Sequence, residues 1–586
     1  MLQPVKRATV FDWLWLVAWG AASSAWCIGA ARELGATYDE PVYVSRGLEH
    51  WRIGSHYGLL KLGTMPLPID VATLPLYLWE RGHGVTLNAD SDVDRLLPSA
   101  RAGTLIFWWL LLFYGGRTGR EIAGPWGGRL AVALLAIEPS LLAHASLATT
   151  DIAVSACLLA FVYHYRASRE HQQELGWLRR VGVPSFWFGA CVLAKASGLM
   201  FGPLCMFAVE LERLLRRGEL VPPAIDARWP TYFRALWSAW QPWRRHCGHI
   251  IGLGLILVFV YCGCDWHPQT SFLNWARELP PTHLNSAILW IAEHLRLFSN
   301  AGEGLARQVT HNCRGHGVYL LGQTAARSLW YYFPVALTIK LSVPLLLLPL
   351  VLLAVRPRAL LNWASAAAAI LLAFSLAYRV QIGVRLVLPL VALGIAGLSG
   401  SLVAACQQAR FPSIRRILIG GTAACVAWTA VAAIQVFPEA LCYTNPLWGG
   451  TARGYLLLSD SNYDWGQGLA DLRRWQQDHR VENLDVWYMG SDPAVNALHS
   501  VPLHDLPLRS PEDLIAREHG HYLAASTTFV YGSFENTDSH RMVAAYLRKT
   551  APAARTQTYL IYDFTKAPAS SVVKAGAVTA TEQPAE

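Results

Sequence analysis

The chain has 586 residues, of which 53% are hydrophobic and only 15% are charged. Soluble globular domains carry about 25% charged residues, so this composition excludes a soluble protein and predicts one that crosses a membrane several times. The net charge of +9 does not indicate a nucleic-acid partner. Most lysines and arginines fall in short loops between apolar segments, where they orient membrane proteins.

Apolar segments that can cross a bilayer recur along the chain. We expect the first segment, residues 11–31, to stay uncleaved, because it is longer than the core of a signal peptide. Lys195 interrupts residues 184–211, which we therefore interpret as two short, buried legs. A span needs roughly 18 apolar residues, and the pattern predicts about 11 transmembrane helices. They are expected at residues 11–31, 102–116, 128–146, 152–165, 184–196, 198–211, 250–263, 332–355, 361–378, 386–406 and 417–436.

The loop charges predict the orientation of these helices. Every second loop is rich in arginine, and the loops between them are less basic. Because basic loops stay in the cytoplasm, we expect four regions on the outer face: residues 32–97, Asp151, residues 264–330 and everything after residue 437.

The chain changes character after residue 437 and becomes like a soluble domain. A helix is expected at 464–480 and another at 539–549, with strands at 484–489, 522–531 and 558–564. This alternation favours a small α/β domain. The predicted fold is therefore a polytopic α-helical membrane protein with a small C-terminal α/β domain outside the cytoplasm. Its parts are a transmembrane domain at 1–437 with a structured first outer loop at 32–97, the α/β domain at 438–566 and a disordered tail at 567–586.

Three carboxylates are the candidates for catalysis. Asp39 and Glu40 follow the first span, flanked by Tyr43, and Asp151 follows the third. If the spans alternate in direction, all three emerge on the same face. A carboxylate in a partly apolar pocket can act as a general base. The simpler alternatives are that the Asp-Glu pair is solvated and that Asp151 caps a helix.

Four cations are the candidates for binding an anionic substrate. Lys61 lies in the first outer loop, Lys195 between the short legs, Lys340 within a span and Arg385 after a short outer loop. Their side chains could simply reach the lipid headgroups. Alternatively, they clamp the phosphate of a lipid-linked substrate at the membrane surface.

The sequence predicts no metal site. The eleven cysteines are scattered, and the close pair Cys262 and Cys264 has no matching ligand pattern, so neither a zinc site nor a disulfide framework is expected. The spacing of His311, Arg314 and His316 is not a recognised ligand pattern either. A dependence on a divalent metal stays open.

Several motifs together resemble the GT-C class of membrane glycosyltransferases. Within it, the chain is most similar to bacterial relatives of the protein O-mannosyltransferases and of the lipid A aminoarabinose transferase, which are phospholipid carrier-dependent enzymes. The resemblance spans nearly the whole chain in order. One departure is Met65-Pro66-Leu67-Pro68, where relatives often carry His-Pro-Pro-Leu. The matching residues are Asp39-Glu40, the run 139–144 leading to Asp151, the run 193–198, Tyr331-Tyr332-Phe333-Pro334 with Lys340, Gly383-Val384-Arg385 with Leu388-Pro389, and the run 460–467.

The resemblance implies a reaction and a place in the cell envelope. It implies transfer of a sugar from a polyprenyl-phosphate donor, with inversion, to a protein or glycolipid acceptor on the outer face of a bacterial inner membrane. Mannosyl transfer in protein glycosylation is one example of such a reaction. Asp39 would act as the base, Asp151 and Glu40 would orient the acceptor, and Lys195, Lys340 or Arg385 would neutralise the departing lipid phosphate. The C-terminal domain would be periplasmic, and the partners would be the donor, the acceptor and membrane lipids.

A multi-span transporter is the alternative. In that case the intramembrane residues Glu138, Lys195 and Lys340 would line an ion or substrate pathway. Many transporters are built from internal repeats of spans, and the two halves of this sequence show no such similarity. A large structured outer loop also suits an enzyme better.

Overall fold

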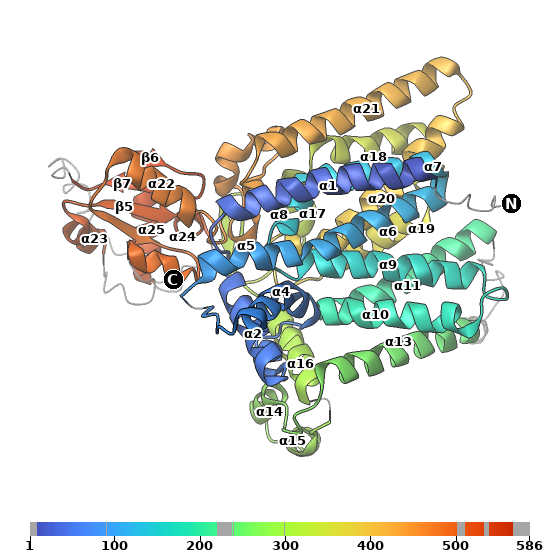
Figure 1. Ribbon diagram of the computed structural model, residues 1–586, viewed down its shortest axis with the longest axis horizontal. Coiled ribbons are helices and arrows are strands. Elements are labelled where there is room, and N and C mark those ends of the chain that lie inside the picture. The colour runs from blue at the N-terminus through green and yellow to red at the C-terminus, as the bar shows by residue number, and fades with distance from the viewer. Residues whose placement is uncertain are drawn as a thin grey trace, which may run out of the picture.

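Long apolar helices lie side by side and form a bundle in this computed structural model (Figure 1). The structure describes residues 9–89, 91–218, 237, 240–297, 299–500, 510–532 and 538–565, so the tail expected at 567–586 lies outside the described residues. The bundle consists of α1 (Val10–Glu33), α5 (Val93–Gly103), α6 (Leu105–Ala123), α7 (Pro125–Ile137), α8 (Pro139–Ala145), α9 (Asp151–Glu170), α10 (Val183–Ala194), α11 (Gly198–Arg217), α13 (Gln241–Cys262), α17 (Tyr332–Lys340), α18 (Val343–Val355), α19 (Trp363–Ser375), α20 (Leu388–Gln407) and α21 (Pro412–Gln435).

The bundle makes this a multi-pass membrane protein. Among the described residues, five helices are long and apolar enough to cross a membrane, or up to seven if each of two bent pairs counts as one span. Each apolar segment singled out in the sequence falls on one helix or on a bent pair of helices, and α10 and α11 meet at Lys195 as expected. The count of about eleven spans stays a prediction.

Two bent helix pairs meet in the middle of the bundle. The first pair, α7 and α8, bends by 66° at Glu138, where Pro139 cannot donate a backbone hydrogen bond. The second pair, α17 and α18, bends by 111°. The span expected over 332–355 is therefore broken by a sharp bend and is not a single straight helix. The Ser342 amide (3.2 Å) and hydroxyl (2.7 Å) donate to the Glu138 carboxylate, so the two bends are bonded to each other.

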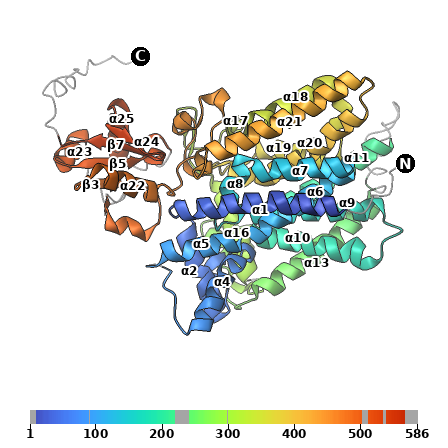
Figure 2. The same cartoon turned by 45° about the horizontal axis from the view of Figure 1, so that its top comes forward.

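Shorter helices gather at the end of the bundle away from the N-terminus (Figures 1 and 2). The segment 32–97 contributes α2, α3 and α4, whereas the segment 264–330 contributes α14 to α16 and a hairpin. Their bounds are α2 (Glu40–Ile53), α3 (Tyr57–Leu60), α4 (Leu67–His83), α14 (Thr270–Arg277), α15 (His283–His294), α16 (Ser299–Arg314), β1 (Val318–Leu320) and β2 (Gln323–Ala325).

The C-terminal part forms a five-stranded sheet in the order β4-β3-β5-β7-β6, at the same end of the molecule (Figure 2). Strand β3 runs parallel to β4 and β5, whereas β7 runs antiparallel to β5 and β6. Separate apolar clusters, one containing Leu472 of α22 and the other Val543 of α25, cover the two faces. The bounds are β3 (Leu484–Trp487), β4 (His499–Ser500), β5 (Tyr522–Ser526), β6 (Ala554–Arg555), β7 (Tyr559–Asp563), α22 (Leu469–His479), α23 (Pro511–Glu518), α24 (Thr527–Tyr531) and α25 (Asp538–Lys549).

The strand expected over 522–531 is correct only in its first half. Residues 527–531 form α24, because the hydroxyls of Ser526 and Thr527 and the amide of Thr528 bond to the buried Asp464 carboxylate and turn the chain out of the sheet. Short helical turns complete the structure, at Leu178–Gly182, Pro357–Leu360, Val384–Val387, Ala440–Cys442, Pro446–Trp448, Thr451–Leu456, Asp460–Asn462 and Pro493–Ala497.

Candidate active site

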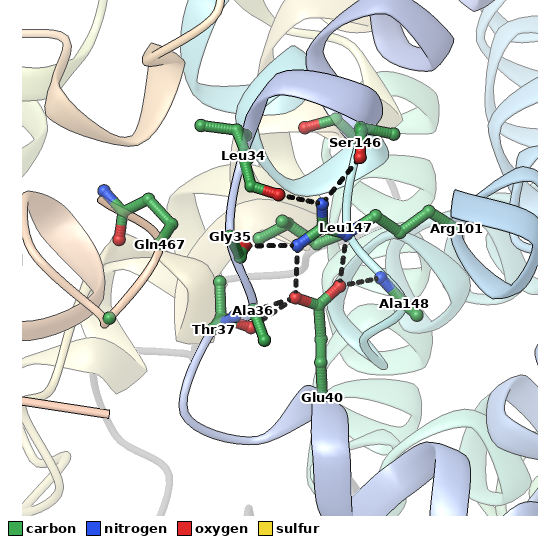
Figure 3. Close-up of polar contacts among 12 residues, drawn as sticks. Leu34, Gly35, Ala36, Thr37, Glu40, Arg101, Ser146, Leu147, Ala148 and Gln467 are labelled. Atoms are coloured by element: carbon green, nitrogen blue, oxygen red, sulfur yellow. Dashed lines mark hydrogen bonds and ion pairs between the residues drawn. The ribbon is translucent and has the colours of Figure 1, made fainter. Parts of the chain in front are cut away.

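A buried ion pair fixes the start of the segment 32–97 (Figure 3). Glu40 is fully buried and accepts from Arg101 Nε (2.8 Å) and Nη2 (2.6 Å). It also accepts from the amide and hydroxyl of Thr37 (both 2.9 Å) and the amide of Ala148 (2.7 Å). Burial raises the pKa of the Glu40 carboxyl, but Arg101 and these bonds outweigh it and hold the pKa below its usual range. Glu40 is therefore an ionised anchor.

Arg101 extends this anchor to the end of α1. Its remaining N–H groups donate to three backbone carbonyls, those of Ala31 (2.9 Å), Leu34 (2.9 Å) and Gly35 (2.7 Å). All five donors of a guanidinium are thus used. Because Ala148 lies just before α9, the anchor joins the end of α1, the start of α2, α5 and the start of α9. It sets the positions of the residues next to it in the chain.

Asp39, the residue before this anchor, pairs with a cation from a distant segment. It sits at the start of α2 without capping the helix, and its carboxylate accepts from Arg385 Nη1 at 2.9 Å. The Arg385 guanidinium also lies over the ring of Trp465, with its Cζ 4.0 Å from the ring centroid. The Asp39 side chain keeps 22% of its surface exposed. It can therefore meet a substrate, whereas the Glu40 side chain cannot.

Asp151 forms the second acidic position, at the start of α9. It is fully buried, and its Oδ1 accepts from Lys195 Nζ at the break between α10 and α11. Its Oδ2 has no hydrogen-bond partner among the described residues, although it is buried as well. A buried carboxylate oxygen without a donor costs free energy. A bound ligand or water that donates a hydrogen bond to this oxygen would remove that cost.

The two ion pairs belong to one cluster. Arg385 interacts electrostatically with Asp39, Asp151 and Asp460, and Tyr43 also interacts with Asp39, Arg385 and Asp151. The Tyr43 hydroxyl accepts from Thr64 at 3.4 Å. The structure thus brings together four predicted candidates, Asp39, Asp151, Lys195 and Arg385, from four separate parts of the chain, with Tyr43 beside them.

The other predicted cations have different surroundings. Lys340 Nζ donates to the backbone carbonyls of Leu441 and Asn462, both at 2.7 Å. Asn462 Oδ1 in turn accepts from the amide of Val384, next to Arg385. Lys340 therefore supports the loop that carries Arg385. Lys61 is exposed, with its Nζ 6.0 Å from the centroid of the Tyr57 ring, and no described contact joins it to the acidic cluster.

Sequence reasoning missed further residues of the cluster. His144 interacts with Asp151, and its buried Nδ1 has no partner within the described part of the chain. Asp460 lies near Arg385 and Asp39, and burial raises its pKa to about 6 although Arg385 opposes the shift. Both residues fall within motifs already noted, 139–144 and 460–467. Their place in those motifs could have identified His144 and Asp460 as candidates, although their residue types alone indicated no role in the site.

The comparisons with known proteins bear on the fold only. No family model and no curated protein matches the sequence. Among solved structures, the chain is similar to ArnT from Cupriavidus metallidurans bound to undecaprenyl phosphate. The TM-score is 0.45 and the identity 12%, over 94% of this chain and 98% of ArnT.

The chain is also similar to two structures of an Archaeoglobus fulgidus oligosaccharyltransferase. For AglB in complex with an inhibitory peptide and a dolichol-phosphate, the TM-score is 0.40 and the identity 12%, over 72% of this chain and 56% of AglB. For the apo form the TM-score is 0.44 and the identity 11%, over 89% and 71%. These neighbours are GT-C glycosyltransferases, the class that the sequence motifs resemble. A likeness of this size carries no argument about substrate or mechanism.

Proposed function

We propose that this protein is a membrane glycosyltransferase. It transfers a sugar from a polyprenyl-phosphate donor to an acceptor on the outer face of a bacterial inner membrane, with the part after residue 437 in the periplasm. The observation that carries the proposal is the paired arrangement of Asp39 with Arg385 and Asp151 with Lys195 in one electrostatic cluster. Such a cluster offers both a base and the positive charge that a phosphate leaving group needs.

In this proposal Asp39 is the catalytic base. It is the exposed carboxylate of the cluster, and it takes the proton from the acceptor as the acceptor attacks the anomeric carbon. The attack occurs opposite the departing phosphate, so the configuration inverts. Arg385, which already faces both acids, and Lys195 neutralise the released lipid phosphate. No strong general acid is required, because phosphate leaves readily without one.

Asp151 orients the substrate in the same scheme. Its unpaired Oδ2 accepts a hydrogen bond from a hydroxyl of the sugar or the acceptor. Glu40 and Lys340, by contrast, are positioning residues, because their bonds go to the backbone and side chains that hold the cluster. Tyr43 lies beside Asp39 and the donor. Lys61 is proposed only as an outer contact for the lipid phosphate.

An apolar cavity supports a polyprenyl donor. It measures about 1030 Å³, lies between α11, α18, α19 and α20, and is lined mainly by leucine and alanine. Leu390 lines both this cavity and a small neighbouring one, which also contacts Tyr378. Tyr378 interacts electrostatically with Asp151. In this proposal an isoprenoid chain occupies the cavity, with its phosphate at the end nearest Tyr378 and the cluster.

The transporter alternative has less support. Glu138 bonds to Ser342, and Lys340 bonds to two backbone carbonyls. Both charged groups therefore have hydrogen-bond partners within the protein.

The test is sugar transfer by the full-length protein reconstituted in vesicles with a panel of polyprenyl-phosphate sugars. Mass spectrometry follows the loss of each lipid-linked sugar. We expect Asp39→Asn to lower the transfer rate by about 10²–10⁴-fold. Asp94→Asn is the matched control, because it changes another carboxylate of the same loop, whose side chain is 55% exposed. Transfer by Asp39→Asn at the native rate would refute the assignment of the base.

A further inference from the structure

Three metal-type ligands converge in the first outer loop, away from the cluster described above. They are His50 near the end of α2, His56 just before α3 and Asp70 in the first turn of α4. Their ligand atoms all lie within 4.8 Å of one another. The two imidazole rings stack with centroids 3.6 Å apart and an interplanar angle of 15°. Two ring nitrogens and one carboxylate oxygen therefore lie close together, and a rotation of one imidazole out of the stack would direct all three to one ion.

The local fold holds these residues in place without an ion. Gly54 ends α2 in the left-handed conformation (φ 78°), which an ordinary residue rarely adopts, and the chain then turns back through α3 to α4. Helices α2 and α4 consequently lie against each other (Figure 1). The Trp51 indole nitrogen donates to the carbonyl of Asp70 at 3.2 Å and fixes their relative height. The site is preorganised by the backbone.

The hydrogen bonds of the three residues are incomplete. Asp70 is only 2% exposed; its Oδ2 lies 2.8 Å from His56 Nε2 and accepts from the Tyr261 hydroxyl of α13 at 2.8 Å. Its Oδ1 and the Nδ1 of His50 are both buried and have no partner in the described ranges. Buried polar atoms are normally satisfied, so two unsatisfied atoms in one cluster indicate a missing ligand.

We propose that His50, His56 and Asp70 bind a zinc ion. Two imidazoles and one carboxylate with an open fourth position are a recurrent ligand set for Zn²⁺. Magnesium and calcium are disfavoured, because they prefer all-oxygen ligand sets. The Tyr261 hydroxyl orients the Asp70 carboxylate, as outer-shell partners of metal ligands commonly do. The ion would tie α2, α3 and α4 to the end of α13 and so stiffen the loop that begins at Asp39.

This site could not be predicted from the sequence, for a physical reason. His50 and His56 are separated by an irregular turn, and Asp70 follows after a second helix. The three therefore match none of the short spacings by which zinc sites are recognised. Only the packing of α2 against α4 brings them together. This inference is independent of the proposed transfer reaction.

The test is zinc binding by the purified full-length protein in detergent. The protein is stripped with a chelator, loaded with zinc chloride and dialysed, and the metal is measured by plasma mass spectrometry. We expect one tightly held zinc per chain in the native protein. We expect a loss of more than about a hundredfold in affinity for His50→Gln, and a loss of about 10–100-fold for Tyr261→Phe, which removes only an outer-shell bond.

His83→Gln is the matched control, because His83 is an exposed histidine of α4 whose ring bonds to the carbonyl of Trp79. It should hold zinc like the native protein. Hydrogen exchange over residues 40–83 gives a second readout, which zinc should slow in the native protein but not in His50→Gln. A native protein that retains no zinc, or a His50→Gln variant that holds it as tightly as the native protein, would overturn the proposal.

Discussion

The substitution Glu40→Gln separates a positioning role from a catalytic one. The native carboxylate accepts five hydrogen bonds, two of them from Arg101, and both side chains are at most 1% exposed. A glutamine keeps the shape but loses the charge. Its amide nitrogen would also turn a donor towards the donors of Arg101, Thr37 or Ala148. The guanidinium would then be buried without a counter-charge.

The expected cost follows from that burial. Removing one partner of a buried ion pair costs about 3–5 kcal/mol, because the remaining charge is left uncompensated. The amides of Thr37 and Ala148 can exchange only when their hydrogen bonds to Glu40 open. Each 1.4 kcal/mol lost from the free energy of that opening corresponds to a factor of ten in the exchange rate. Their hydrogen exchange should therefore accelerate by about a hundred- to several-thousand-fold in Glu40→Gln.

The assay is hydrogen exchange of the full-length protein, read on peptides that cover residues 31–40 and 146–151. The control is Glu49→Gln. It breaks an exposed pair with Arg46, with side chains 44% and 40% exposed, and should change exchange little. If Glu40→Gln kept native protection but lost sugar transfer, the reasoning would be refuted, and Glu40 would belong to the chemistry.

Two further predictions concern Asp464 and Gly383, which lie near the cluster. Burial raises the pKa of Asp464 from 3.8 to about 6, so the folded state holds this proton more tightly than the unfolded one. The free energy of unfolding should therefore fall by about 3 kcal/mol as the pH rises from about 3 to 7. Asp464→Asn should reduce the pH dependence of the free energy of unfolding by that amount, whereas the exposed Asp478→Asn should leave it unchanged. An unchanged pH dependence in Asp464→Asn would contradict the assignment. Gly383→Ala should lower transfer about a hundredfold by displacing Arg385. The backbone φ of Gly383 is 148°, and a Cβ there would lie 2.2 Å from Ser461 Oγ. Gly420→Ala is the control, because Gly420 has open space around it. A native transfer rate in both variants would contradict the prediction.

The sequence was sufficient for the helices and for the main members of the cluster. Hydropathy located each apolar helix, because the length and composition of a span are local properties. The chain order of Asp39, Asp151, Lys195 and Arg385, read through their resemblance to a known class, singled out residues that the fold brings together. For the helices and these four residues, the sequence itself was enough for a prediction.

The rest depended on contacts between distant segments. Arg101 lies 61 residues from Glu40, and the partners of Lys340 lie 101 and 122 residues away. No periodicity or spacing can indicate such pairs. Glu40 and Lys340 were therefore both expected to take part in the reaction. Similarly, averaged hydropathy cannot detect the 111° break after Lys340, because the segment stays apolar on both sides. The described contacts of Glu40 and Lys340 go to groups that hold the cluster in place, and a part of these two residues in catalysis stays a prediction.

The C-terminal part contributes to the candidate site as well as covering it. Trp465 provides the ring over which Arg385 lies, and Asn462 accepts from the amide of Val384 while its carbonyl accepts from Lys340. The carboxylate of Asp464, between them, bonds to the start of α24 at the edge of the sheet. Movement of the sheet would therefore be transmitted to Arg385 through the short segment 462–465. An acceptor that binds the C-terminal part could in this way influence the position of the cation facing Asp39.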